Sequence, residues 1–515
     1  MLFTSYEFLF FFFPLTCAVF FALCAGRAAR AATAWLALMS VVFYGYWSPR
    51  YVVLLLASVT VNFYAGQWLL KCRAGPSRVS ARHVLIAALG LNLAALAYFK
   101  YANFFVDTLR AASGIDFAIS AVMLPIGISF FTFTQIAFLV DTYQGKVSEA
   151  RFLPYLLFVT YFPHLIAGPV LHHAEMMPQF GRKETYRFRL DSVLSGLTLL
   201  LIGLVKKIVL ADGIQPFVAP AFDAPASHLL SGVEAWGAVL AYSLQLYFDF
   251  SAYSDMANGL SRIFNVELPL NFDSPYKSRN IVEFWRRWHM TLSRFLRDYL
   301  YVTLGGNRFG LPRRYLNLML TMLLGGLWHG AGWTFVIWGA LHGIYLVVNH
   351  AWQAALGAIP RRVQSAPSRL TTAAGVLLTF LAVTVAWTFF RATSLESALR
   401  MLSAMAGHNG WVMPIEWHAP LQGALGAAPS GLRFDDLTAF AGVRQLAWIA
   451  ALLAIAWFCP NSQQIMARLG RWHAGGLRLG QMAGWGALGA TTTIICMLAA
   501  INASQGVSEF IYFNF

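Results

Sequence analysis

Apolar runs long enough to cross a lipid bilayer recur along the whole sequence, and they restrict the fold more than any other feature. A spanning helix needs about 20 mostly apolar residues, because the hydrocarbon core of a bilayer is about 30 Å thick. Such runs lie near residues 8–25, 33–47, 51–70, 84–99, 121–141, 190–211, 233–252, 315–330, 333–350, 371–391, 444–459 and 481–502. They predict an all-α polytopic membrane protein with about 12 transmembrane helices, since helices satisfy their own backbone polar groups in lipid.

The composition agrees with a membrane protein. Only 11% of the residues are charged, against about 25% in soluble domains. The net charge of +15 is typical of basic cytoplasmic loops that face anionic headgroups, so no nucleic acid partner is predicted. The five cysteines show no metal-binding spacing, and no metal site is predicted. No repeat or linker divides residues 1–515, which are therefore expected to form one membrane-embedded domain.

Basic residues predict which loops face the cytoplasm. The stretch Arg262–Arg314 contains ten Lys and Arg residues, and residues 360–370 and 466–480 are also basic. Loops 212–232 and 405–440 are poor in Lys and Arg and are expected to lie outside, as are both termini. The apolar region 153–170 is interrupted by three prolines and a glycine, which favours a re-entrant segment over a spanning helix.

Residues Ile281 to Tyr299 have apolar side chains at helical spacing and arginines at the other positions. We interpret this segment as an amphipathic helix at the cytoplasmic headgroup level. Its arginines, Arg286 and Arg287 above all, could also bind the phosphates of a donor molecule. His289, beside the apolar stripe, would by itself usually be structural.

His329 lies in the apolar stretch "LLGGLWHGAGWTFVIWGALHG" (323–343). An ionisable residue at membrane depth is costly and is a candidate for function. The surrounding glycines would let a ligand approach closely, but they would equally allow tight helix packing, and a neutral imidazole can simply bond to a backbone carbonyl. Asp141, Asp249 and Asp255 could orient a histidine, pair with an arginine or mark helix ends.

Five segments together resemble the membrane-bound O-acyltransferases, in the bacterial branch that includes alginate O-acetylation proteins and teichoic acid D-alanyl transferases. The segments are "LPIGISFFTFTQIAFLVDTYQG" (124–145), "YFPHLIAGPV" (161–170), "LQLYFDFSAYSDMANGLSRIFNVELPLNF" (244–272), "SPYKSRNIVEFWRRWHMTLSRFLRDYLYVTLGGNR" (274–308) and "NLMLTMLLGGLWHGAGWTFVIWGALHG" (317–343). The alginate-type branch is the most similar, and the resemblance covers at least residues 1–350. Ala252 stands where the family pattern has glycine.

The resemblance implies a fold of transmembrane, re-entrant and amphipathic helices around a thinned core with a funnel. It implies an inner-membrane acetyltransferase that moves an acetyl group from cytoplasmic acetyl-CoA toward an exported polysaccharide such as alginate. The family's essential histidine corresponds to His329 and a second functional histidine to His289. Acetyl-CoA is the donor substrate, no other cofactor is implied, and a periplasmic or membrane-anchored partner commonly completes the transfer.

Within that mechanism, a buried neutral imidazole suits a general base, although an acyl-carrying histidine nucleophile is an alternative. His289, Asn271 or glycine N–H groups could donate to the oxyanion, and Asn271 joins Arg286 and Arg287 as a candidate for donor binding. A different class of protein, a transporter or export channel of a secretion complex, would use His329 to line a substrate or proton path. His342, which lacks the "WHG" setting, is expected to tolerate substitution better.

The predicted orientation can be tested by cysteine labelling. A cysteine placed in loop 405–440 should react with a membrane-impermeant thiol reagent in intact spheroplasts, because the loop is expected to face outward. Labelling that appears only after lysis would reverse the orientation derived from the basic loops.

Overall fold

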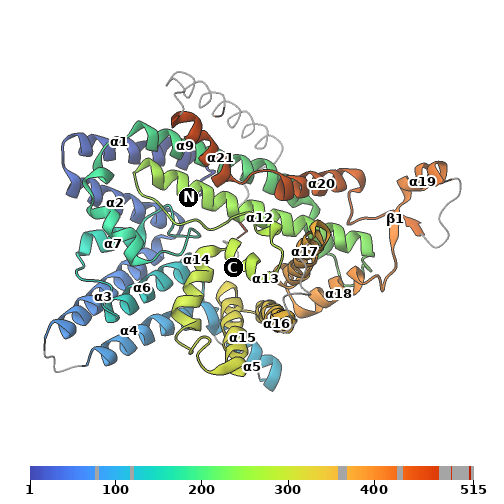
Figure 1. Ribbon diagram of the computed structural model, residues 1–515, viewed down its shortest axis with the longest axis horizontal. Helices are drawn as coiled ribbons and strands as arrows, with labels where there is room; N and C mark the ends of the chain where they lie inside the picture. The colour runs from blue at the N-terminus through green and yellow to red at the C-terminus, as the bar shows by residue number, and fades with distance from the viewer. Residues whose placement is uncertain are drawn as a thin grey trace. The chain divides into compact units, whose positions relative to one another are not determined.

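The computed structural model describes residues 1–75, 80–115, 121–357, 368–425 and 433–474, together with residues 489, 510 and 511. Helices make up almost all of the regular structure (Figure 1). The exception is a parallel pair of three-residue strands, β1 (Val412–Pro414) and β2 (Arg433–Asp435). Both strands belong to the segment that was predicted as an external loop, so the all-α prediction is confirmed apart from this small sheet.

The chain divides into two compact units that are each assembled from separate segments. The first contains Met1–Leu204, Ala252–Asn271 and Leu469–Phe515, and the second contains Val205–Ser251 and Phe272–Arg468. That residues 1–515 form one membrane-embedded domain therefore remains a prediction. The helices up to Val205 are α1 (Phe13–Ala25), α2 (Ala29–Trp47), α3 (Pro49–Ala74), α4 (Ala81–Leu96), α5 (Ala102–Ser113), α6 (Ile128–Tyr143), α7 (Phe152–Thr160), α8 (His173–Gly181) and α9 (Leu190–Val205).

The later helices include the long α12, whose first part belongs to the second unit and whose last part belongs to the first. They are α10 (Asp212–Ile214), α11 (Ala219–Phe222), α12 (Gly232–Ile263), α13 (Ile281–Arg287), α14 (Met290–Phe295), α15 (Gly310–His329), α16 (Trp333–Gly357), α17 (Arg369–Arg391), α18 (Leu395–Met405), α19 (His418–Leu425), α20 (Gly442–Phe458) and α21 (Ser462–Ala474). Four π-helical segments extend or interrupt them: η1 (Glu7–Phe12), η2 (Ala97–Tyr101), η4 (Lys206–Ala211) and η7 (Leu296–Tyr301).

Within the described ranges, six helices are long and apolar enough to cross a membrane, and a bent pair of helices could supply a seventh span. The six are Glu7–Ala25, Pro49–Arg73, Ala81–Ser113, Leu190–Phe222, Trp333–Leu356 and Arg369–Arg391. Helices also occupy the other predicted ranges, except that 481–502 lies outside the described residues but for Gly489. The chain is thus a multi-pass membrane protein, but the number of 12 spans, the thinned core and the funnel remain predictions.

The region predicted as re-entrant contains a helix that is too short to span a bilayer. α7 has nine residues, or about 14 Å at 1.5 Å per residue, and buried turns follow it from Tyr161 to Gly168. The ring nitrogen Nε2 of His164 lies 2.9 Å from the carbonyl oxygen of Phe158. The side chain of His164 therefore supports the turn, and this geometry is what a re-entrant segment requires.

In the second unit, α15 and α16 form an antiparallel hairpin whose backbones approach closely (Figure 1). A side chain at Gly326 would collide with the carbonyl oxygen of Phe335 and with Gly339. A side chain at Gly339 would collide with the carbonyl oxygen of Met322. Small residues are what bring membrane helices together in this way. The glycine-rich sequence therefore serves helix packing, and it places His329 at the end of α15 against residues of α16.

A buried ion cluster joins η4, α10 and α12 within the second unit. The ammonium nitrogen of Lys207 lies 2.8 Å from a carboxylate oxygen of Asp249 and 2.9 Å from one of Asp212. Lys207 lies within the apolar run 190–211, and these contacts explain how the run accommodates its charge. Breaking such a pair would leave an uncompensated buried charge at a cost of about 3–5 kcal/mol.

Candidate active site

The structure brings the two predicted histidines together in the second unit. The ring centroids of His289 and His329 are 6.3 Å apart, although 40 residues separate them in the sequence. His289 is fully buried and His329 is 4% exposed. Two imidazoles at this separation can act on the same small substrate group, and we call this pair the histidine site.

Aromatic rings surround His329 on several sides. The centroid of its imidazole lies 5.0 Å from Trp328, 5.0 Å from Trp338 on α16 and 5.2 Å from Phe390 at the end of α17. Three helices therefore contribute to the position of one ring. The sequence did not single out Trp338 or Phe390, because buried aromatic residues are common in any helical core.

His289 lies at a break that the sequence analysis did not anticipate. The predicted continuous helix from Ile281 to Tyr299 is wrong: α13 ends at Arg287, and α14 begins at Met290. His289 adopts the left-handed backbone region with φ of 42°, which is uncommon for residues other than glycine. Trp288 and His289 at the break are buried, whereas Arg286 is exposed. The break directs the imidazole against Phe250, at 4.8 Å between centroids.

Burial also determines the protonation state of His289. Removal from solvent lowers the pKa of the His289 imidazole to about 3, because desolvation disfavours the charged ring. The ring is therefore neutral at physiological pH. A neutral imidazole can accept a proton through one nitrogen and donate a hydrogen bond through the other.

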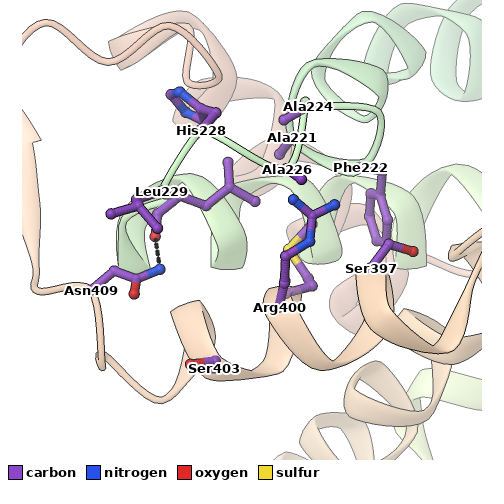
Figure 2. Close-up of a pocket in the computed structure, with 12 residues that line it drawn as sticks. Ala221, Phe222, Ala224, Ala226, His228, Leu229, Ser397, Arg400, Ser403 and Asn409 are labelled. Atoms are coloured by element: carbon purple, nitrogen blue, oxygen red, sulfur yellow. Dashed lines mark hydrogen bonds between the residues drawn. The ribbon is translucent and has the colours of Figure 1, made fainter.

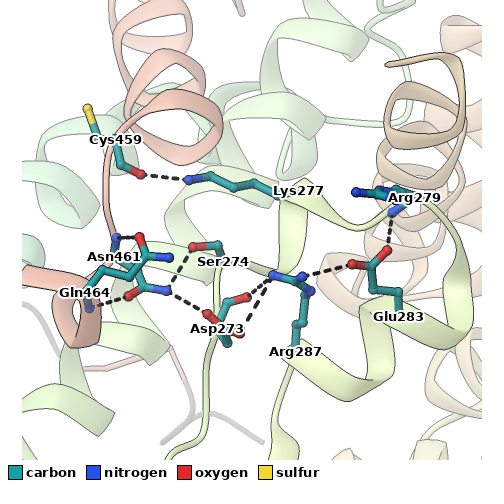
Figure 3. Close-up of polar contacts among 9 residues, drawn as sticks. All are labelled: Asp273, Ser274, Lys277, Arg279, Glu283, Arg287, Cys459, Asn461 and Gln464. Carbon is teal, nitrogen blue, oxygen red and sulfur yellow. Dashed lines mark hydrogen bonds and ion pairs between the residues drawn. The ribbon is translucent and has the colours of Figure 1, made fainter. Parts of the chain in front are cut away.

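The two candidate arginines differ in their surroundings. Arg287 pairs with Glu283 at 2.9 Å and with Asp273 at 3.7 Å, in the network that Figure 3 shows. Arg286 is exposed, and its side chain makes no hydrogen bond or ion pair with any described residue. Arg286 is thus available to a ligand, whereas the contacts of Arg287 fix the segment that leads from Asp273 into α13.

Asn271, Asp249 and Asp141 are further candidates from the sequence. Asn271 is buried and belongs to the first unit, whereas the histidine site belongs to the second. Asp249 accepts a hydrogen bond from Lys207, and Asp141 accepts one from Lys146. Among the described residues, no group of three His, Cys, Asp or Glu side chains could hold a metal ion.

His342, expected to tolerate substitution, packs close to the histidine site. It is fully buried, and its ring centroid lies 4.7 Å from that of Trp338, which also contacts His329. Neither ring nitrogen of His342 has a hydrogen-bond partner in the described part of the chain. Replacement of His342 would disturb the support of His329, so the exposed His83 on α4 is the better control for loss of a histidine.

The chain is similar to known proteins over the range that contains the histidine site. The family model for the membrane-bound O-acyltransferase family matches residues 23–390, a range that includes both histidines. A peptidoglycan O-acetyltransferase of Helicobacter pylori is 44% identical over 401 residues, which cover 73% of this chain and 74% of that protein. A protein of Azotobacter vinelandii named "Probable alginate O-acetylase AlgI" is 38% identical over 525 residues and the full length of both chains.

A more distant relative is a teichoic acid D-alanyltransferase of Streptococcus thermophilus. It is 27% identical over 280 residues, which cover 52% of this chain and 68% of that protein. The predicted resemblance to both branches is therefore confirmed.

The histidine site leads to a prediction about single substitutions. His329→Ala should reduce polymer acetylation in cells to near background, because loss of a general base costs about 10²–10⁴-fold in rate. His289→Asn should also impair it, while asparagine tolerates the left-handed backbone of this position. Acetylation is measured per amount of membrane-inserted protein, with His83→Ala as the control.

Near-normal acetylation by His329→Ala at matched protein levels would contradict this role of His329. A loss by His83→Ala of the same size would show that the assay responds to histidine loss in general.

Proposed function

Since the chain belongs to the membrane-bound O-acyltransferase family, and is therefore an acyltransferase enzyme, we propose that it transfers acetyl groups from cytoplasmic acetyl-CoA to an exported polysaccharide. The observation that carries this proposal is the histidine site, a buried imidazole pair in a multi-pass membrane protein. The names of its relatives, a peptidoglycan O-acetyltransferase and an alginate O-acetylase, support acetyl as the acyl group and a polysaccharide as the acceptor. The transporter alternative has no comparable support.

The proposed reaction uses His329 as the base. Its imidazole takes the proton of an attacking hydroxyl as that oxygen bonds to the thioester carbonyl carbon. The tetrahedral intermediate collapses with loss of the CoA thiolate, which recovers the proton from the imidazolium. The neutral ring of His289 can donate a hydrogen bond to the oxyanion. An acyl-imidazole on His329 would be the alternative route.

The two substrates would reach this site from opposite faces of a bacterial inner membrane. Ten Lys and Arg residues between Arg262 and Arg314 favour donor binding on the cytoplasmic side. A periplasmic or membrane-anchored partner would complete the transfer outside. Arg286, exposed and without an ion-pair partner among the described residues, is the leading candidate for the CoA phosphates.

Substitutions of the two neighbouring arginines should have different effects on donor binding. Arg286→Gln should weaken acetyl-CoA binding to the purified protein about tenfold, because one charge-assisted contact to phosphate is lost. Arg287→Gln should mainly lower thermal stability, because Glu283 and Asp273 lose their partner. Binding is measured by calorimetry in lipid nanodiscs, and unchanged affinity in the double variant would exclude this surface as the donor site.

A further inference from the structure

A pocket of about 120 Å³ lies in the second unit, and neither histidine of the histidine site lines it. It is formed by the end of α11, by the loop between α11 and α12, by α18 and by the turn that follows α18 (Figure 2). Two candidate spans, Leu190–Phe222 and Arg369–Arg391, end beside it. The polar and charged side chains that line it are His228, Ser397, Arg400, Ser403 and Asn409.

Arg400 is the unusual group in this pocket. It is partly buried, and its side chain makes no hydrogen bond or ion pair with any residue that the structure describes. Its Nε atom is buried and lacks a partner there. Figure 2 shows the side chain extending from α18 toward the loop that contains Ala224 and Ala226. Desolvating a guanidinium without a partner is unfavourable, so this position fits a group that accepts an anion.

Neighbouring charges do not neutralise Arg400. Asp223 pairs instead with Arg391, at 3.0 Å. Glu234 is buried and accepts hydrogen bonds from the backbone nitrogens of Ser231 and Ala439. No Asp or Glu is among the residues that line the pocket. The lining therefore carries one guanidinium and no carboxylate, which favours a ligand that supplies its own negative charge.

The other lining groups indicate what carries that charge. The ring nitrogen Nε2 of His228 lies 3.5 Å from a carboxylate oxygen of Glu234. The side-chain amide of Asn409 donates a hydrogen bond to the carbonyl oxygen of Leu230 at 2.9 Å. The Asn409 side-chain oxygen can accept a hydrogen bond from a ligand hydroxyl, whereas the Ser403 hydroxyl already lies 3.2 Å from the ring nitrogen Nδ1 of His408. A planar guanidinium next to such a group matches a carboxylate on a hydroxyl-bearing ring.

We propose that this pocket, with Arg400 as its anion-binding group, binds one carboxylate-bearing sugar residue of the acceptor polysaccharide on the outer face of the membrane. The inference rests on the proposed function, which supplies both the acceptor and its side of the membrane. The predicted external position of residues 212–232 and 405–440 agrees with it. The pocket would hold the polymer and would take no part in the acyl transfer itself.

The test uses the full chain in phosphatidylcholine nanodiscs and a defined probe, a trimer of uronic acid. Calorimetry should detect binding to the unmodified protein, and Arg400→Gln should weaken it about tenfold or more, because a bidentate charged contact is lost. Arg400→Lys should retain part of the affinity. Arg433→Gln, which removes an exposed arginine of β2 outside the pocket, should bind the trimer as the unmodified protein does.

Four results would overturn the proposal: no binding of the trimer, equal binding of a neutral glucan trimer, equal binding by Arg400→Gln, or an anionic lipid headgroup as the only ligand that Arg400 recognises. The last is detected by exchanging phosphatidylcholine for phosphatidylglycerol. Acetyl-CoA hydrolysis by the unmodified protein in the same nanodiscs separates the two proposals. If hydrolysis occurs and the trimer does not bind, only this inference fails, whereas absence of hydrolysis would contradict the proposed function.

Discussion

The structure depends on how polar groups are accommodated in an interior that offers them no water. An unpaired polar group in such surroundings is costly, and a charge more so. The buried ammonium group of Lys207 is paired with the carboxylates of Asp212 and Asp249. His289 is accommodated as a neutral ring. His329 lies at the end of a hairpin whose glycines let α15 and α16 approach closely.

The packing around the two histidines has a consequence for the proposed chemistry. An imidazole held among rigid aromatic rings loses little free energy to reorganisation when a substrate arrives. The rings of Trp328, Trp338 and Phe390 define where the His329 imidazole can point, and the left-handed backbone of His289 brings the second imidazole to the same place. Under the proposed function, packing and catalysis would depend on the same contacts, and His342 contacts Trp338 of this set, so it is a poor control.

Much of the helical organisation could be predicted because apolar run length is a local property of the sequence. The histidine site could be predicted from motifs that include His289 and His329. The break at His289 could not, since the spacing of apolar residues from Ile281 to Tyr299 continues across it. The partners of Lys207 and Arg287 depend on long-range packing, which no periodicity reveals. The strands β1 and β2 are too short to produce an alternating pattern.

The central claim is that the histidine site transfers an acyl group from a thioester donor. The most direct measurement is release of free CoA thiol from acetyl-CoA by the purified chain in nanodiscs, compared with His329→Ala at equal thermal stability. The account predicts slow, saturable thiol release by the unmodified protein and a rate near background for His329→Ala. Equal rates in the two proteins would contradict it, because the reaction would then proceed without the residue around which the site is built.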